Sequence, residues 1–74
     1  MKCTVNVMWD AEVNVWHCKS EDIPGLVLES HSYELLLYEY KNEARDFLEV
    51  NCNYKGPFYL SFETIRVEYV EDAS

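Results

Sequence analysis

The side chains of this 74-residue chain that are best able to do chemistry are its 14 carboxylates, two histidines and three cysteines. A metal-dependent hydrolytic site requires acidic side chains from separate elements to converge on a divalent cation. The first predicted strand instead offers Val5, Asn6 and Val7, and Asp10 falls in the turn that follows. The other candidate acids share outer positions of later elements: Glu34, Glu39, Glu43, Glu63 and Glu68. We therefore interpret the acids as a solvated surface and assign no metal ligand.

The histidines and cysteines do not predict a nucleophilic site. Cys18 and His31 are the one candidate couple, but nothing in the sequence places them side by side. Cys3, Cys18 and Cys52 are odd in number, far apart and unlike any zinc-ligand spacing, so we interpret all three as reduced core residues. We assign no catalytic residue and no cofactor, and we expect a protein that is not an enzyme.

The formal charge of −8 narrows the class of partner. A nucleic-acid backbone would be repelled unless the basic residues formed a patch, and these are scattered singly: Lys2, Lys19, Lys41, Arg45, Lys55 and Arg66. Direct nucleic-acid binding is therefore not expected. The acidity serves either solubility or electrostatic complementarity to a basic protein partner.

Length and composition predict one domain, residues 1–74, in which a hydrophobic fraction of 49% is rich enough for a real core. The sequence opens with no signal-like segment and holds no apolar run of membrane-spanning length, so we expect a cytoplasmic protein without membrane contact.

The elements that would position any site begin with a hairpin. Residues 2–9 alternate between apolar and polar side chains, residues 10–13 turn the chain, and residues 14–19 form the return strand. This loop places both tryptophans on the buried face and pairs two sets of residues: Trp16 with Val7, and Cys18 with Val5.

A rigid corner follows at residues 20–29, with Asp22, Pro24 and Gly25 as its structural turn residues. Pro24 fixes its own φ, and Gly25 permits the positive φ that a type II turn requires. Residues 26–29 are predicted to form a short third strand.

A helix is predicted from Tyr33 to about Asn51, with Ser32 as its N-cap. Its apolar stripe consists of Tyr33, Leu36, Leu37, Tyr40, Ala44, Phe47 and Leu48. A long final strand is expected at residues 58–70, followed by a solvated tail at 71–74. The apolar phase of that strand changes near Glu63, so either a bulge keeps both sets on the core or a second copy covers the other face.

Together these elements predict an α+β fold of order β-β-β-α-β. The four-stranded sheet has order 3-2-1-4, with the last strand parallel to the first and one helix on one face. The other face is left exposed, which predicts a homo-oligomer, a dimer or higher. Four apolar residues at outer positions are the partner-binding candidates: Met8 and Val15 on the sheet, and Leu35 and Tyr38 on the helix.

The first half of the chain resembles the HicB-like antitoxin domains of bacteria, including short stand-alone members. The residues that carry the resemblance span roughly residues 5 to 37: Trp9-Asp10-x-Glu12-x-x-Val15-Trp16, Ser20-x-Asp22-Ile23-Pro24-Gly25-Leu26-x-x-Glu29 and Ser32-x-Glu34-x-Leu36. The resemblance implies a degraded ribonuclease H-like unit that lacks its catalytic acids, self-assembles and blocks a small basic HicA-type ribonuclease.

Three departures limit this resemblance. Asn14 stands where the family often has Gly, and residues 17–19 are more polar than usual. The given sequence contains no helix-turn-helix or ribbon-helix-helix segment after the last strand, so operator binding is not implied. The leading hypothesis is a non-enzymatic, antitoxin-like interaction domain. The alternatives are a stand-alone homo-oligomer with a structural or small-ligand-binding role and, as the least favoured, a metal-dependent nuclease.

Overall fold

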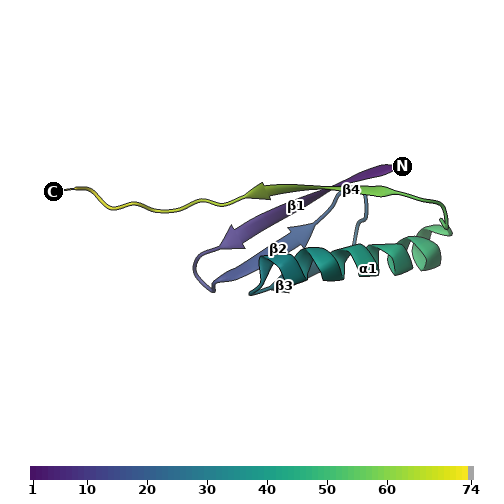
Figure 1. The fold of residues 1–74 in the computed structure, drawn as a ribbon, viewed down its shortest axis with the longest axis horizontal. Coiled ribbons are helices and arrows are strands. Elements are labelled where there is room, and N and C mark those ends of the chain that lie inside the picture. Colours follow the sequence, from purple (N-terminus) through teal and green to yellow (C-terminus); the bar gives the residue numbers. More distant parts are fainter. Residues whose placement is uncertain (74) are drawn as a thin grey trace.

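The computed structural model describes residues 1–73, so the last residue of the predicted tail, Ser74, lies outside the described residues. The elements are β1 (Lys2–Asp10), β2 (Val15–Lys19), β3 (Val27–Ser30), α1 (Tyr33–Cys52) and β4 (Tyr59–Ile65). The sheet order is β3-β2-β1-β4, with β4 parallel to β1 and the other pairs antiparallel. One helix lies along one face of this sheet (Figure 1). The predicted fold class and strand order are confirmed.

The β1–β2 hairpin keeps the predicted faces but not the predicted register. Trp16 lies opposite Trp9 rather than Val7, and Cys18 lies opposite Val7 rather than Val5. The register prediction was wrong because the turn is formed by residues 11–14, where Asn14 adopts a left-handed φ of 55°. A shift of two residues leaves every side chain on its original face, so both tryptophans still pack on the core side.

The corner after β2 takes over part of the strand pairing. Beyond Lys19, the backbone N–H of Thr4 donates to the Asp22 carboxylate at 2.8 Å, and the Ser20 hydroxyl donates to the Thr4 carbonyl. Gly25 has a φ of 97°, and the Leu26 N–H donates to the Ile23 carbonyl at 3.3 Å across the turn. Because Leu26 closes this turn, β3 begins one residue later than predicted.

Helix α1 begins and ends at residues whose chemistry favours those positions. The Ser32 hydroxyl accepts the N–H of Leu35 at 3.2 Å, as an N-cap does, and Asn53 ends the helix with a left-handed φ of 51°. The helix is one residue longer than the predicted limit at Asn51. Its buried residues all belong to the predicted stripe: Leu36, Tyr40, Ala44 and Leu48.

The core lies between α1 and the inner face of the sheet, which presents Cys3, Val5, Val7, Trp16 and Cys18 to the helix. The prediction that all three cysteines are core residues was wrong for Cys52, which is exposed. Cys52 is the last residue of α1 and falls outside the apolar stripe. The other two thiols are buried, and burial raises the pKa of Cys3 and raises that of Cys18 to about 12.

Strand β4 ends five residues earlier than predicted, and it has no bulge. Its pairing with β1 is continuous from Lys2 opposite Tyr59 to Met8 opposite Ile65. Residues 66–73 continue as an extended segment that leaves the sheet (Figure 1). This segment raises the Cα radius of gyration to 14.7 Å, compared with about 11 Å expected for a compact chain of this length. The alternative that a second copy covers the exposed apolar residues remains a prediction.

Candidate partner-binding face

The face of the sheet that points away from α1 is the candidate site, and we call it the outer face. Alternate residues of all four strands form it, and the strand registers align Ile65, Met8, His17 and Glu29 in one row across the sheet. No described element covers this row (Figure 1). Met8 is 45% exposed, Ile65 56% and Val27, on β3, 60%. A sheet face with this apolar content in so small a domain is typical of a contact surface.

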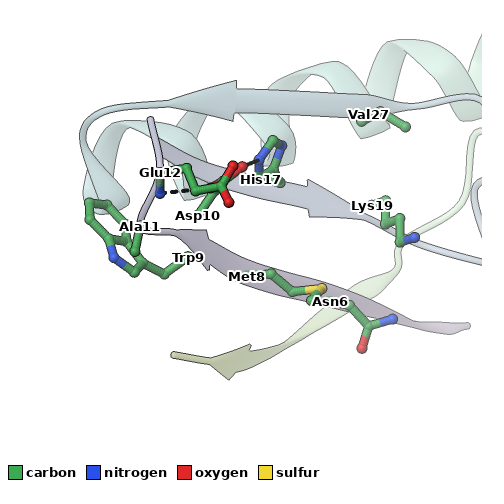
Figure 2. A pocket seen from close by; sticks show the side chains of 9 residues that line it. All are labelled: Asn6, Met8, Trp9, Asp10, Ala11, Glu12, His17, Lys19 and Val27. Carbon is green, nitrogen blue, oxygen red and sulfur yellow. Dashed lines mark hydrogen bonds and ion pairs between the residues drawn. The ribbon is translucent and has the colours of Figure 1, made fainter. Parts of the chain in front are cut away.

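A shallow depression of about 490 Å³ occupies the outer face near the β1–β2 turn (Figure 2). Its lining combines the apolar side chains of Met8 and Val27 with the carboxylates of Asp10 and Glu12. The complete lining is Asn6, Met8, Trp9, Asp10, Ala11, Glu12, His17, Lys19 and Val27. None of these nine described residues carries a hydroxyl or thiol, so the depression offers binding groups without a serine- or cysteine-type nucleophile.

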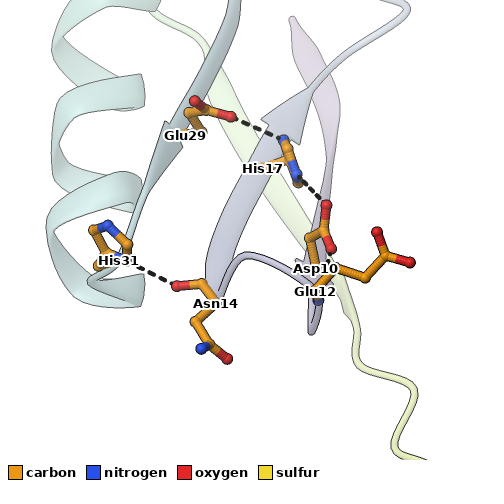
Figure 3. A network of polar contacts seen from close by, with 6 residues as sticks. All are labelled: Asp10, Glu12, Asn14, His17, Glu29 and His31. Atoms are coloured by element: carbon orange, nitrogen blue, oxygen red, sulfur yellow. Dashed lines mark hydrogen bonds and ion pairs between the residues drawn. The ribbon is translucent and has the colours of Figure 1, made fainter.

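His17 sits between two carboxylates on this face (Figure 3). Its Nε2 lies 3.5 Å from Asp10 Oδ2, and its Nδ1 lies 3.4 Å from Glu29 Oε2. Asp10 is fixed from the other side, because its Oδ1 accepts the backbone N–H of Glu12 at 3.0 Å. Long contacts between partly exposed groups contribute little to stability. The carboxylates therefore remain able to accept hydrogen bonds from a cationic group of a bound molecule.

The four apolar candidates from the sequence fall on opposite sides of the molecule. Met8 and Val15 lie on the outer face, where Val15 is opposite Asp10. Leu35 and Tyr38 lie on the outward side of α1, 47% and 61% exposed. The structure therefore keeps each pair together, since Leu35 and Tyr38 are three residues apart on one side of α1, but it places the two pairs on opposite sides of the molecule.

Three exposed apolar residues of the outer face, Val27, Tyr59 and Ile65, were not among the sequence candidates. Val27 lies in a continuous apolar run, residues 26–28, in which no alternation marks the exposed member. For Ile65 the sequence leaves two interpretations open, a bulge that keeps it on the core or a second copy that covers it, so it does not stand out as a candidate. Strand alternation could have identified it. Leu60 and Phe62 face the core, so in a strand without a bulge Ile65 faces outward, directly opposite Met8.

The residues considered for catalysis do not come together. Cys18 is fully buried, and its raised pKa keeps the thiol protonated at neutral pH, while His31 is exposed and its Nδ1 lies 2.8 Å from the Asn14 carbonyl (Figure 3). Asp10 and Glu63 lie on the outer face, whereas Glu34 lies on the helix. Within residues 1–73, no three His, Cys, Asp or Glu side chains are grouped as metal ligands. We therefore derive no reaction step.

Helix α1 is also too polar for a bilayer. Among the described residues, no helix combines the length and the apolar character that crossing a membrane requires.

The chain is similar to known proteins in sequence and in structure. A family model described as a domain of unknown function, DUF1902, matches residues 2–70, and so includes the segment that continues beyond β4. The crystal structure of a hypothetical protein from the extremely thermophilic bacterium Thermus thermophilus is 30% identical in sequence, with a TM-score of 0.77. The match covers 95% of this chain and 100% of that one. No protein of curated function matches the chain.

Proposed function

We propose that this chain, which belongs to the DUF1902 family of domains of unknown function, is a non-enzymatic, antitoxin-like interaction domain. In this role it binds a small basic ribonuclease of the HicA type and prevents that enzyme from reaching its RNA. The β-β-β-α-β order of the chain is the one that the HicB-like resemblance implies. The observation that carries the proposal is the uncovered outer face, where exposed apolar side chains stand beside carboxylates.

The chemistry of the outer face suits a basic protein. Met8 and Val27 provide apolar contact area, and methionine adapts its shape to different partners. Around them, Asp10, Glu12 and Glu29 provide acceptors for lysine or arginine side chains. An apolar centre with a charged rim is the usual anatomy of a protein–protein interface.

The net charge of the molecule supports the same partner. A chain with a formal charge of −8 attracts a cationic protein over a distance and accelerates its association. Because salt screens this attraction, association with the partner should slow as salt concentration rises. One of the six basic residues, Arg45, also has an internal role, since its guanidinium donates to the carbonyls of Tyr54 and Gly56 at 2.7 and 2.8 Å.

A stand-alone homo-oligomer that binds a small ligand is the second candidate function. The depression of about 490 Å³ favours it, because small-molecule sites typically measure about 300–1,000 Å³. A gene without a short basic reading frame beside it would support this alternative. The metal-dependent nuclease requires magnesium-dependent cleavage that is lost in Asp10→Asn.

The proposal predicts a short basic reading frame next to this gene, and the test uses the protein that it encodes. Co-expression should restore the growth of cells that produce this neighbour, and the two proteins should co-purify. Met8→Arg places a cation in the outer face and should abolish both effects, whereas Tyr38→Arg makes the same charge change on the helix and should preserve them. Absence of binding and rescue by the unaltered protein would refute the antitoxin role. Loss of binding in Tyr38→Arg alone would move the interface to the helix.

A further inference from the structure

Residues 66–70, the segment that follows β4, are rich in strand-forming side chains but pair with no strand of residues 1–73. The segment is extended and leaves the domain (Figure 1). Val67 and Tyr69 are 75% and 86% exposed. Valine and tyrosine, which make up three of the five residues, are strand-forming, so the composition favours the extended conformation. The segment therefore has the conformation and the side chains of a strand but lacks a neighbour within residues 1–73.

The two sides of this segment differ in chemistry. Arg66 points to the core side, because its guanidinium lies 4.5 Å from the ring centroid of Trp9 and 5.6 Å from that of Trp16. Ile65 lies on the outer face opposite Met8. Strand alternation then places Val67 and Tyr69 with Ile65 on one side, and Glu68 with Arg66 on the other.

We propose that residues 64–70 pair antiparallel with the same residues of a second copy of this chain, about a two-fold axis through Val67. In this register the neighbours are complementary at each position of the central five residues: Val67 with Val67, Ile65 with Tyr69, and Arg66 with Glu68. Directly opposed apolar pairs and opposite charges stabilise a sheet, whereas like charges destabilise it. The partner of residues 64–70 is therefore the same segment of a second copy.

Other registers lack this complementarity. Centring the axis on Arg66 places two arginines face to face, and centring it on Glu68 opposes two glutamates. A shift by one residue in the pairing places Val67 opposite a charged residue and joins apolar to polar sides. The chosen register opposes Glu63 to Glu71, which sets the end of the paired region at Thr64 and Val70.

The sheet provides the edge that this pairing requires. β4 is the last strand in the order β3-β2-β1-β4, so its far side presents free N–H and C=O groups among the described elements. In this register Thr64 and Ile65 of β4 lie opposite Val70 and Tyr69 of the other copy, and residues 66–68 of the two segments lie opposite each other. The two sheets then continue as one, both helices lie on the same face, and the outer-face depression of each copy stays open. The inference thus concerns a surface that the proposed ribonuclease binding does not use.

A charge exchange tests the pairing on the purified protein alone, by sedimentation equilibrium. Arg66→Glu sets glutamate against Glu68 of the other copy and should weaken the dimer about tenfold or more. The double variant Arg66→Glu, Glu68→Arg restores opposite charges and should recover most of that loss. Both variants remove the contact of Arg66 with the tryptophans, and the exchange also breaks and restores the ion pair that Arg66 Nε makes with Glu68 Oε1 of its own chain. Sedimentation reports dimerisation, and urea denaturation of each variant at a concentration where it is monomeric measures the effect within one chain, so recovery that exceeds this effect belongs to the pairing between copies. An unaltered protein that stays monomeric, or a dimer that the single change leaves intact, would overturn the proposal.

A cysteine placed on the two-fold axis tests the register, in a Cys52→Ser background because Cys52 is exposed. Val67→Cys should form a disulfide-linked dimer under mild oxidation, since residues opposed on antiparallel strands have Cα atoms about 4.5–5.5 Å apart. Tyr69→Cys alone should not link, and the mixture of Ile65→Cys with Tyr69→Cys should. Linking through Tyr69→Cys but not Val67→Cys would show a different register and overturn the pairing as stated.

Discussion

The two faces of the sheet are built by alternate residues of the same strands, yet their surroundings are opposite. On the inner face, Val5 and Val7 are fully buried beneath α1, whereas Met8, the next residue on β1, is 45% exposed. The chain contains the helix that the inner face needs, but within residues 1–73 it holds nothing that covers the outer one. This difference indicates that the inner face specifies the fold and that the outer face is free to serve association.

The largest effect is expected in α1, the helix that covers the inner face. Two adjacent leucines there compare a side chain that packs on the inner face with one that faces solvent. Leu36→Ala should lower the free energy of unfolding by about 2–5 kcal/mol, because Leu36 is completely buried. For a domain of this size, such a loss approaches the whole stability. Leu35→Ala, on the exposed side, should change it by no more than about 0.5 kcal/mol. Urea denaturation followed by tryptophan fluorescence measures both, and equal losses would contradict the division.

The corner between β2 and β3 should show a smaller effect. Gly25→Ala should cost about 1–2 kcal/mol, because an alanine at a φ of 97° is strained. The added Cβ would lie 3.5 Å from the Phe47 ring, an ordinary contact, so the cost comes from the backbone. Gly25→Asn is the matched control, with a smaller loss expected because asparagine tolerates positive φ better. Thermal or urea unfolding that ranks alanine as the milder change would exclude this explanation.

Alkaline pH should lower the free energy of unfolding, because Cys18 and Tyr40 are buried in the core. Burial raises the pKa of Cys18 from 9.0 to about 12 and also raises the pKa of Tyr40. Between pH 9 and pH 12 the Cys18 thiol therefore stays protonated in the folded protein, whereas it loses its proton in the unfolded chain. Its contribution to the free energy of unfolding is fully present below pH 9 and is lost as pH rises.

We expect Cys18 to account for a loss of about 1 kcal/mol between pH 7 and pH 10. Urea denaturation at both pH values measures the loss. Cys18→Ala removes the titrating thiol and should reduce the pH dependence, although it lowers stability at both values. An unchanged slope in that variant would assign the alkaline effect to other groups.

The outer face should give the smallest effect on folding. Met8→Arg should change the free energy of unfolding by no more than about 0.5 kcal/mol, because the side chain already faces solvent. Val7→Ala, one residue away, removes buried volume and should cost more than about 1 kcal/mol, as a core truncation does. Circular dichroism thermal scans compare the two. A severe loss in Met8→Arg would mean that the outer face contributes to the core.

The sequence was sufficient for the fold because the relevant signals are local. Ser32 marks the start of α1, and the spacing of Leu36, Tyr40 and Ala44 identifies its buried side. The hairpin register was not predictable, since it depends on the φ of Asn14 in the turn. The end of β4 also escaped prediction, because strand-forming residues continue to Val70, whereas pairing with β1 stops at Met8 opposite Ile65, two residues before β1 ends.

The candidate site was predictable only in part. Alternation along β1 and β2 was enough to place Met8 and Val15 on the outer face. The contacts of His17 with Asp10 and Glu29 required the registers of three strands, which no local pattern supplies. The depression likewise exists only once β1, β2 and β3 lie side by side.

Chemical-shift mapping by nuclear magnetic resonance would test the central claim most directly. The labelled protein is titrated with a small basic ribonuclease of the HicA type, the proposed partner. We predict that the amide signals of Met8, His17 and Val27 change on binding, while those of Leu35 and Tyr38 stay in place. Changes confined to α1, or none at any concentration, would contradict the assignment of the outer face as the surface that binds the partner.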